Sequence, residues 1–245
     1  MKTSRIVAQA ICMMVAGTML LMVVPKAAAW NSSEPLTFNG LQNNEPIENY
    51  YNGGTGGDGS GPGPNYGVTF QANGLALVSL YSGGSGNFLP YNGTSTGDPV
   101  PGSSTSAYFL TGSGDIMNVA GGFTGGFSFY YTAIYDPGTV TVWSGLNGTG
   151  TLLASLSLAV TPWQGDTGPS GQELFDNWVE EGIAFAGTAE SVNFSGTANE
   201  IGFDYITAAP STSVPDATGI SAELLAGLGM IGSALRLRRK AAATV

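Results

Sequence analysis

The sequence predicts an all-β fold, a single antiparallel β-sandwich of jelly-roll type. Between residues 30 and 209, aromatic and β-branched residues recur in short runs that alternate with polar residues. Turn residues separate the runs, and no window of this stretch has the apolar spacing of a helix. About 180 residues are enough for one domain with its own hydrophobic core.

The first half of the domain opens with a short strand near residues 36–38. Apolar alternation then marks the next strands, which are expected at 67–71, 75–81, 107–110, 116–119 and 127–135. Ala72-Asn73-Gly74 contains the Asn-Gly pair of a tight hairpin turn. We therefore expect the strands on either side of it to pair with each other.

The second half continues with strands expected at 139–143, 151–161, 178–185, 191–194 and 201–207. Asp136-Pro137-Gly138 forms the turn before the first of these, and residues 146–150 form the turn before the second. Residues 185–193 resemble residues 194–202, with Gly-Thr-Ala at the same place in each copy. This short repeat predicts a meander of neighbouring antiparallel strands.

Three long loops interrupt the strands, at residues 52–65, 87–106 and 161–172. Long loops at the rim of a sandwich are common places for binding. The first loop contains Gly53-Gly54-Thr55-Gly56-Gly57-Asp58-Gly59, which matches the start of a calcium-binding nonapeptide repeat. That motif needs several stacked copies, and only one is present, so a plain turn-rich loop is the simpler interpretation.

The N-terminal residues 1–29 have the pattern of a secretory signal peptide. Lys2 and Arg5 precede the apolar stretch 6–24, and Ala27-Ala28-Ala29 provides small residues for cleavage. An uncleaved anchor is the alternative. Cys12 lies within the apolar stretch, so a body that starts near Trp30 has no cysteine for a disulfide or a zinc site.

The C-terminus has the three parts of a sorting signal. After a spacer at 210–213, residues 214–219 read Val-Pro-Asp-Ala-Thr-Gly, and the apolar segment 220–235 follows. That segment is shorter than the roughly 20 residues of a permanent membrane-spanning helix. Its basic end contains Arg236, Arg238 and Arg239, which would remain cytoplasmic, and a tail at 241–245 completes the chain.

This C-terminus resembles the PEP-CTERM class of bacterial sorting domains, in the variant that begins Val-Pro-Asp. Val214, Pro215 and Asp216 match the signature, whereas Ala217-Thr218-Gly219 departs from the usual Ser-Gly continuation. The resemblance covers residues 214–240 and implies that an integral-membrane exosortase cleaves the tail. It further implies export, a transient tether in the inner membrane and a final place on the cell surface or in the extracellular matrix.

Charge is distributed very unevenly along the chain. All seven basic residues lie at or before Lys26 or at and after Arg236, there is no histidine, and the stretch between them carries all 17 acidic residues. Such a body repels nucleic acid and anionic lipid, so we expect no nucleic-acid partner and membrane contact only through the tail. Neutral glycans, such as an exopolysaccharide, are compatible with it.

The candidate site residues are few. In jelly-roll carbohydrate-binding domains, an Asp of the closing strand often holds calcium together with an acid near the first strand, which suggests Asp204 with Asn39 and Glu45. Trp163 and Tyr91 lie in predicted loops and are candidates for stacking on sugar rings. No cofactor other than calcium is expected.

An enzymatic role is not expected. Glu173, Asp176, Glu180 and Glu181 form the densest acidic cluster, and glycosidases use a carboxylate pair. However, the body has no His, Lys or Arg to tune a pKa or to stabilise an oxyanion. The expected function is a non-enzymatic structural or adhesive role at the cell surface, with a calcium-supported carbohydrate-binding module as the alternative.

Overall fold

The computed structural model describes Trp30, residues 34–89 and residues 103–208. These ranges contain nine β-strands and two short 3₁₀ segments, and no α-helix, which confirms the predicted all-β class. No helix within them is long and apolar enough to cross a membrane. The predicted signal peptide, the sorting signal with Val214, Pro215, Asp216, Arg236, Arg238 and Arg239, and Tyr91 all lie outside the described residues.

The strands follow the predicted runs closely in position. Their bounds are β1 Glu45–Pro46, β2 Val68–Phe70, β3 Gly74–Val78, β4 Thr105–Phe109, β5 Gly114–Thr132, β6 Gly138–Gly145, β7 Thr149–Leu158, β8 Val179–Ser195 and β9 Gly202–Thr207. The 3₁₀ segments are η1, Leu80–Ser82, and η2, Leu146–Gly148. The opening strand predicted near 36–38 is reduced to a single bridge between Leu36 and Ile206.

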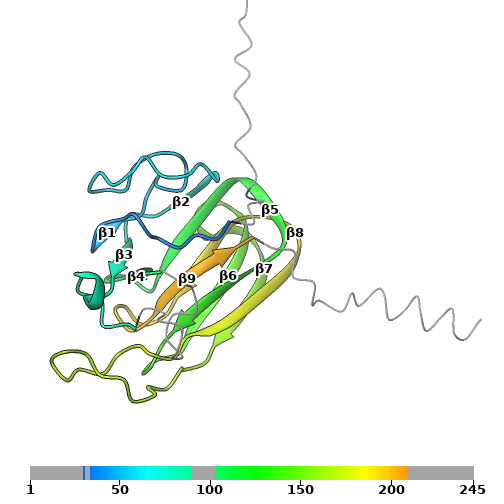
Figure 1. Cartoon of the computed structure of the whole chain (residues 1–245). Helices are drawn as coiled ribbons and strands as arrows, with labels where there is room; N and C mark the ends of the chain where they lie inside the picture. Colours follow the sequence, from blue (N-terminus) through cyan, green and yellow to red (C-terminus); the bar gives the residue numbers. More distant parts are fainter. Residues whose placement is uncertain (1–29, 31–33, 90–102, 209–245) are drawn as a thin grey trace, which may run out of the picture.

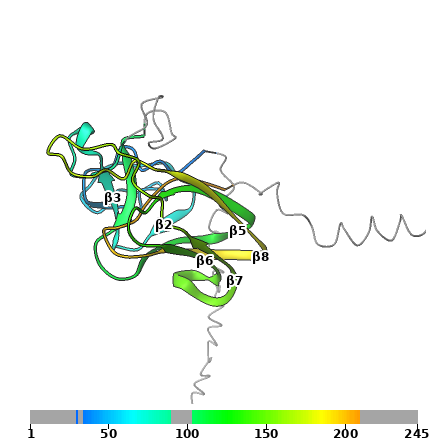
Figure 2. The same cartoon turned by 90° about the horizontal axis from the view of Figure 1, so that it is seen from below.

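The nine strands form one antiparallel sheet that folds over on itself into a sandwich (Figures 1 and 2). The order is β1-β3-β4-β9-β5-β8-β6-β7, and β2 pairs separately with β5. Two long strands belong to both layers. The first part of β5 pairs with β2 and the end of β8, whereas its second part pairs with β9 and the start of β8.

The layers are joined where β5 and β8 bend. The register between them shifts after Asn118 and again after Thr124, as at a β-bulge. Gly122 lies in the first shift with a φ of 75°, a conformation that glycine adopts at little steric penalty. An added Cβ there would lie 2.5 Å from Cγ2 of Thr188.

The bend explains why two predictions from local pattern were wrong. The expected strands 116–119 and 127–135 are one strand, β5, and the expected strands 178–185 and 191–194 are one strand, β8. The first Gly-Thr-Ala, at 187–189, therefore lies inside β8 and does not form a turn. The second leads from β8 toward β9, but β9 pairs with β4 and β5, so the nine-residue repeat is not a meander.

The Asn-Gly turn at residues 72–74 also has a different role from the predicted one. Gly74 N donates to Gln71 O at 3.0 Å, so the turn itself forms. Yet β2 pairs with β5, while β3 pairs with β1 and β4. The two strands that the turn connects therefore do not pair with each other. Asn73 Nδ2 holds it there by donating to Gly114 O at 2.6 Å. The predicted turn at 146–150 does join a hairpin, β6 to β7.

The core between the layers is aromatic. Phe194 lies at its centre, with ring centroids 5.7 Å from Phe129, 6.0 Å from Phe127 and 5.0 Å from Phe203. All four side chains are at most 2% exposed. Burial of each such ring stabilises the fold by roughly 2–3 kcal/mol relative to an exposed ring. The long strands supply three of these rings, and so they bear the main packing of both layers.

Candidate functional site

A pocket lies on the outer face of the layer that contains β3, β4, β9 and β5. Alternation along the strands sets which side chains point outward. Ala107, Phe109 and Phe203 face the core, so their neighbours Ser106, Tyr108 and Gly202 face outward and form the floor of a pocket. Leu77 of β3 and Thr132 of β5 complete this floor.

Two loop segments form the wall of the pocket. Phe175 N donates to Asn87 O at 2.8 Å, and Leu89 N donates to Phe175 O at 3.2 Å, so the segment at 87–89 runs alongside residue 175 like a short parallel ladder. The rings of Phe88 and Trp178 meet edge to face, 5.9 Å apart. Phe88, Phe175 and Trp178 therefore form a small apolar cluster of their own, separate from the main core.

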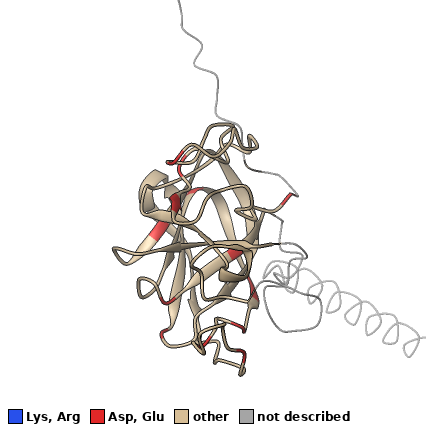
Figure 3. Ribbon diagram, turned by 60° about the vertical axis from the view of Figure 1, so that its left-hand side comes forward, with Lys and Arg blue, Asp and Glu red and all other residues tan. Residues whose placement is uncertain are grey.

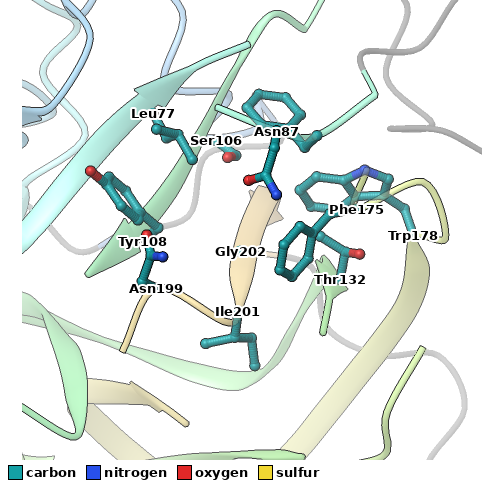
Figure 4. A pocket seen from close by; sticks show the side chains of 11 residues that line it. Leu77, Asn87, Ser106, Tyr108, Thr132, Phe175, Trp178, Asn199, Ile201 and Gly202 are labelled. Carbon is teal, nitrogen blue, oxygen red and sulfur yellow. The ribbon is translucent and has the colours of Figure 1, made fainter. Parts of the chain in front are cut away.

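The pocket measures about 320 Å³ including solvent at its open mouth. This space accepts one edge of a small ligand. Figure 4 shows Tyr108 and Asn199 on one side, Phe175 and Trp178 on the other, and Gly202 between them. An added Cβ at Gly202 would lie 3.6 Å from the ring of Trp178, which is ordinary van der Waals contact.

The pocket offers uncharged polar groups beside aromatic rings. Its lining residues are Leu77, Asn87, Phe88, Ser106, Tyr108, Thr132, Phe175, Trp178, Asn199, Ile201 and Gly202, none of which is charged. Tyr108 donates its hydroxyl to Asn44 Oδ1 at 2.6 Å, and Asn87 Nδ2 lies 3.4 Å from Glu173 O. Burial raises the pKa of Tyr108, so this phenol remains neutral. Amides, hydroxyls and rings in one small pocket suit a polyhydroxylated neutral molecule.

Two of the three predicted calcium residues meet at one place. Asp204 is fully buried, and its Oδ2 accepts a hydrogen bond of 2.6 Å from Ser103 Oγ. Asn39 Oδ1 accepts from the next residue, Ser104 N, at 3.1 Å. Asp204 Oδ1 accepts from Tyr205 N at 2.7 Å. The dipeptide 103–104 thus brings Asp204 and Asn39 together, with their oxygens in hydrogen bonds.

Glu45 lies elsewhere and has another structural role. It is in β1, which is separated from β9 by β3 and β4, so about 14 Å of sheet lies between its backbone and that of Asp204. The Glu45 carboxylate is buried and accepts from the backbone amides of Gln42 at 2.7 Å, Asp58 at 3.1 Å and Ser60 at 2.9 Å. Within the described ranges, no group of three or more acidic or cysteine residues could hold a metal ion.

The hydrogen bonds from Asp58 N and Ser60 N to Glu45 also explain why this loop is rich in glycine. An added Cβ at Gly56 would lie 2.5 Å from Glu45 Oε1, so only glycine lets the loop close over the carboxylate. Burial alone would raise the pKa of Glu45, but hydrogen bonds from Gln42, Ser60 and Asp58 together hold it below its usual value. The Gly53–Gly59 stretch is thus a loop folded around an internal carboxylate.

The acidic cluster around Trp178 does not converge on the pocket. Asp176 is buried and accepts from Gln164 N and Asp166 N at 3.0 Å each, which fixes the loop at 161–172. Glu173 accepts from Tyr135 Oη and Glu180 from Tyr130 Oη. Glu180 and Glu181 are consecutive in β8, so they point to opposite faces.

The predicted stacking residue Trp163 is 38% exposed in its loop, and its Nε1 donates to Asp166 O at 2.6 Å. It is not part of the pocket lining. The prediction from sequence missed the residues that do line the pocket, above all Phe88, Phe175 and Trp178. One signal pointed toward Phe88, because it lies in the predicted loop 87–106 and long rim loops are common places for binding. Phe175 and Trp178 lie after the predicted loop 161–172, so the loop pattern did not indicate them.

No protein-family model and no curated protein sequence matches this chain. Among solved structures, it is similar to a carbohydrate-binding module of Cellvibrio mixtus lichenase 5A in complex with cellotriose. That alignment has 11% identity and a TM-score of 0.32, and covers 56% of this chain and 86% of the module. It is also similar to the K1 cleaved adhesin domain of Lys-gingipain from Porphyromonas gingivalis W83. There the identity is 15%, the TM-score 0.32, and the coverage 57% of this chain and 95% of that domain.

A third similar structure is a glycoside hydrolase family 43 arabinoxylan arabinofuranohydrolase from Bacillus subtilis in complex with cellotetraose. The identity is 20%, and the TM-score is 0.34. The alignment covers 57% of this chain and 25% of the hydrolase, so the chain spans about a quarter of that enzyme's length. In all three cases, the aligned part is little more than half of this chain.

Proposed function

We propose that this chain is a non-catalytic adhesive protein whose sandwich binds a neutral glycan at the pocket over Gly202. The supporting observation is the lining of the pocket, which combines aromatic rings with amides and hydroxyls and has no charged side chain. Carbon-hydrogen faces of sugars pack on aromatic rings, while sugar hydroxyls exchange hydrogen bonds with amides and hydroxyls. The small volume of the pocket suits the edge of one sugar ring, at the end or at a branch of a glycan.

The charge of the body limits the class of glycan. Figure 3 shows acidic residues distributed over the described part of the chain and no Lys or Arg within it. An acidic sugar would be desolvated in a negative field with no cation to pair with it. The proposal therefore excludes uronic acids and sulfated sugars as preferred ligands.

A glycan array that contains both neutral and acidic oligosaccharides tests this function. Wild-type protein should bind at least one neutral glycan saturably and should not prefer acidic ones. Gly202→Val should weaken that binding by at least about ten-fold, because its methyl groups occupy the pocket, a change of about 1.4 kcal/mol. A protein that binds no neutral glycan, or a Gly202→Val variant that binds like wild type, would refute the proposal.

The matched control is Gly182→Val. Gly182 also lies in a strand, and an added Cβ there would meet only Phe127 O at 3.8 Å. It is not among the residues that line the pocket, so its substitution should leave binding unchanged. Repeating the array with a chelator tests the calcium expectation at Asp204 and Asn39: binding that depends on calcium should be lost.

We also propose export and processing by an exosortase, on the basis of the sequence at the two ends of the chain. The first end resembles a signal peptide, and the last resembles a sorting domain with Val214, Pro215 and Asp216 at its signature. Replacing these three residues by alanine should retain the protein in the inner membrane with its tail uncleaved. Equal location and equal mass in the two strains would refute this part of the proposal.

A further inference from the structure

One edge of the sheet differs from all the others. β7, Thr149–Leu158, is the last strand in the sheet order, and among the described residues it pairs only with β6 (Figure 2). It has ten residues, and none is charged or proline. A long uncharged edge presents a row of free N–H and C=O groups that can pair with another strand.

The other open edges are short, covered or acidic. β1 has two residues, and Gly57 N donates to Pro46 O at 2.8 Å from the glycine-rich loop. β2 has three residues, and Phe70 N donates to Glu48 O at 2.9 Å. The start of β8 is longer, but it carries glutamates at 180, 181 and 190. Among the open edges of the described strands, only β7 is neither short, covered nor acidic. Its register with β6 shifts between residues 149 and 154, but residues 154–158 pair with β6 without a shift and form a regular open edge.

The side chains of β7 leave apolar surface at this edge. Leu152 is 48% exposed. Leu153 and Leu156 pack against the main core but are only partly buried. A further strand beside β7 would cover them and extend the core of this layer, in addition to satisfying the free backbone groups.

Charge indicates which partner fits this edge. The chain has a formal net charge of −10, and its body has no basic residue, so two copies repel each other over most of their surface. β6 and β7 together carry no charged side chain. This is the region where two copies can approach without bringing carboxylates together, and it offers no charge that would attract a cationic partner instead.

We infer that two copies of this chain associate through β7, edge to edge, in a closed two-fold dimer. A two-fold axis makes the two β7 strands antiparallel, which is the relation of the described strand pairs in this sheet. The pocket over β3, β4, β9 and β5 lies at the other end of the sheet order, so it remains open in the dimer. The inference is independent of what the pocket binds.

Sedimentation velocity of the purified full-length protein, over a range of concentrations, tests the inference. A monomer–dimer equilibrium is expected, and the dimer should be favoured as sodium chloride is raised to about 0.5 M, because screening weakens the repulsion between copies. Ser155→Lys places two like charges near each other at the middle of the paired edge. It should weaken dimerisation by at least about ten-fold, and Ser157→Glu should act in the same direction.

The control is Thr124→Lys. Thr124 is also exposed, but it lies in β5 and pairs with Thr188 of β8. Circular dichroism melts should show that all three variants fold. A protein that remains monomeric at every concentration and salt, a dimer that Ser155→Lys and Ser157→Glu leave intact, or open-ended filaments in place of a closed dimer would each overturn the inference.

Discussion

Two buried carboxyl groups in this molecule show how strongly local hydrogen-bond partners determine whether such a group is ionised. Glu45 accepts three backbone amides, and its pKa is held below the usual value although burial opposes this. Asp115 is 3% exposed, and its Oδ1 has no hydrogen-bond partner. Burial raises the pKa of Asp115 to about 8 despite a hydrogen bond from Ile116 N. The same chemical group is therefore ionised at one site and mostly protonated at the other at neutral pH.

Asp115→Asn should change how stability depends on pH. Between an unfolded pKa near 3.8 and a folded pKa near 8, the folded wild type binds a proton that the unfolded chain has lost. Wild type should therefore lose stability relative to Asp115→Asn as pH rises from 4 to 8, by up to about 1.4 kcal/mol per pH unit. Urea unfolding at several pH values measures the difference. Parallel curves for Asp115→Asn and wild type would contradict the prediction.

At the scale of elements, the fold depends on two strands that cross from one layer to the other. β5 and β8 supply Phe127, Phe129 and Phe194 to the core, and they bend where their register shifts. A strand can make such a bend when a residue with positive φ and no Cβ lies in the bulge. Gly122 meets that requirement with its φ of 75° and its close approach to Thr188.

Gly122→Ala should therefore destabilise the protein by about 1–3 kcal/mol, through a strained φ and an overlap with Cγ2 of Thr188. The lost stability should appear as a lower urea midpoint with an unchanged slope. Gly182→Ala in β8 is the matched control, since its backbone has no positive φ and its added Cβ has room. If both variants unfold at the same urea concentration, the bend does not depend on Gly122.

At the scale of the whole molecule, the dominant property is the charge of the body, which is entirely acidic between Lys26 and Arg236. In this region, no ion pair between side chains can offset the mutual repulsion of the carboxylates. The pKa of Glu200 reflects this environment, since burial and the neighbouring charge of Asp136 both raise it. The repulsion between distant carboxylates is long-ranged and is therefore sensitive to salt.

We predict that the protein is least stable at neutral pH in low salt and gains stability with added salt, with millimolar calcium and on acidification to about pH 5. The sign follows from the raised folded pKa values of Asp115 and Glu200, which make the folded form bind more protons as pH falls. Glu45 has the opposite effect, because its folded pKa is lowered and acidification removes its contribution to the stability of the fold. That loss begins only below its ordinary pKa of 4.5. Thermal melts across salt and pH provide the measurement. A melting temperature that is independent of salt and falls from pH 7 to pH 5 would show that local contacts dominate instead.

Local patterns along the chain were sufficient for the all-β class, for the place of nearly every strand and for the β6–β7 hairpin, because alternation and turn residues act over a few neighbouring positions. They were sufficient also for the loop that contributes Asn87 and Phe88 to the pocket. They were not sufficient for the pairing of β2 and β3 or for the continuity of β5 and β8. An Asn-Gly pair or a Gly-Thr-Ala segment has the same local chemistry in a hairpin, a crossing turn or a bulge.

The tertiary structure decided which residues meet. It brought Asn39 and Asp204 to the same dipeptide at 103–104, placed Glu45 beneath the glycine-rich loop, and gathered Phe88, Phe175 and Trp178 from two loops into one pocket wall. These contacts join positions tens of residues apart, and each depends on the strand order, which no single segment encodes. The proposed export signals at the two ends differ in kind, since such signals are read as linear segments, and they stay predictions made from the sequence alone.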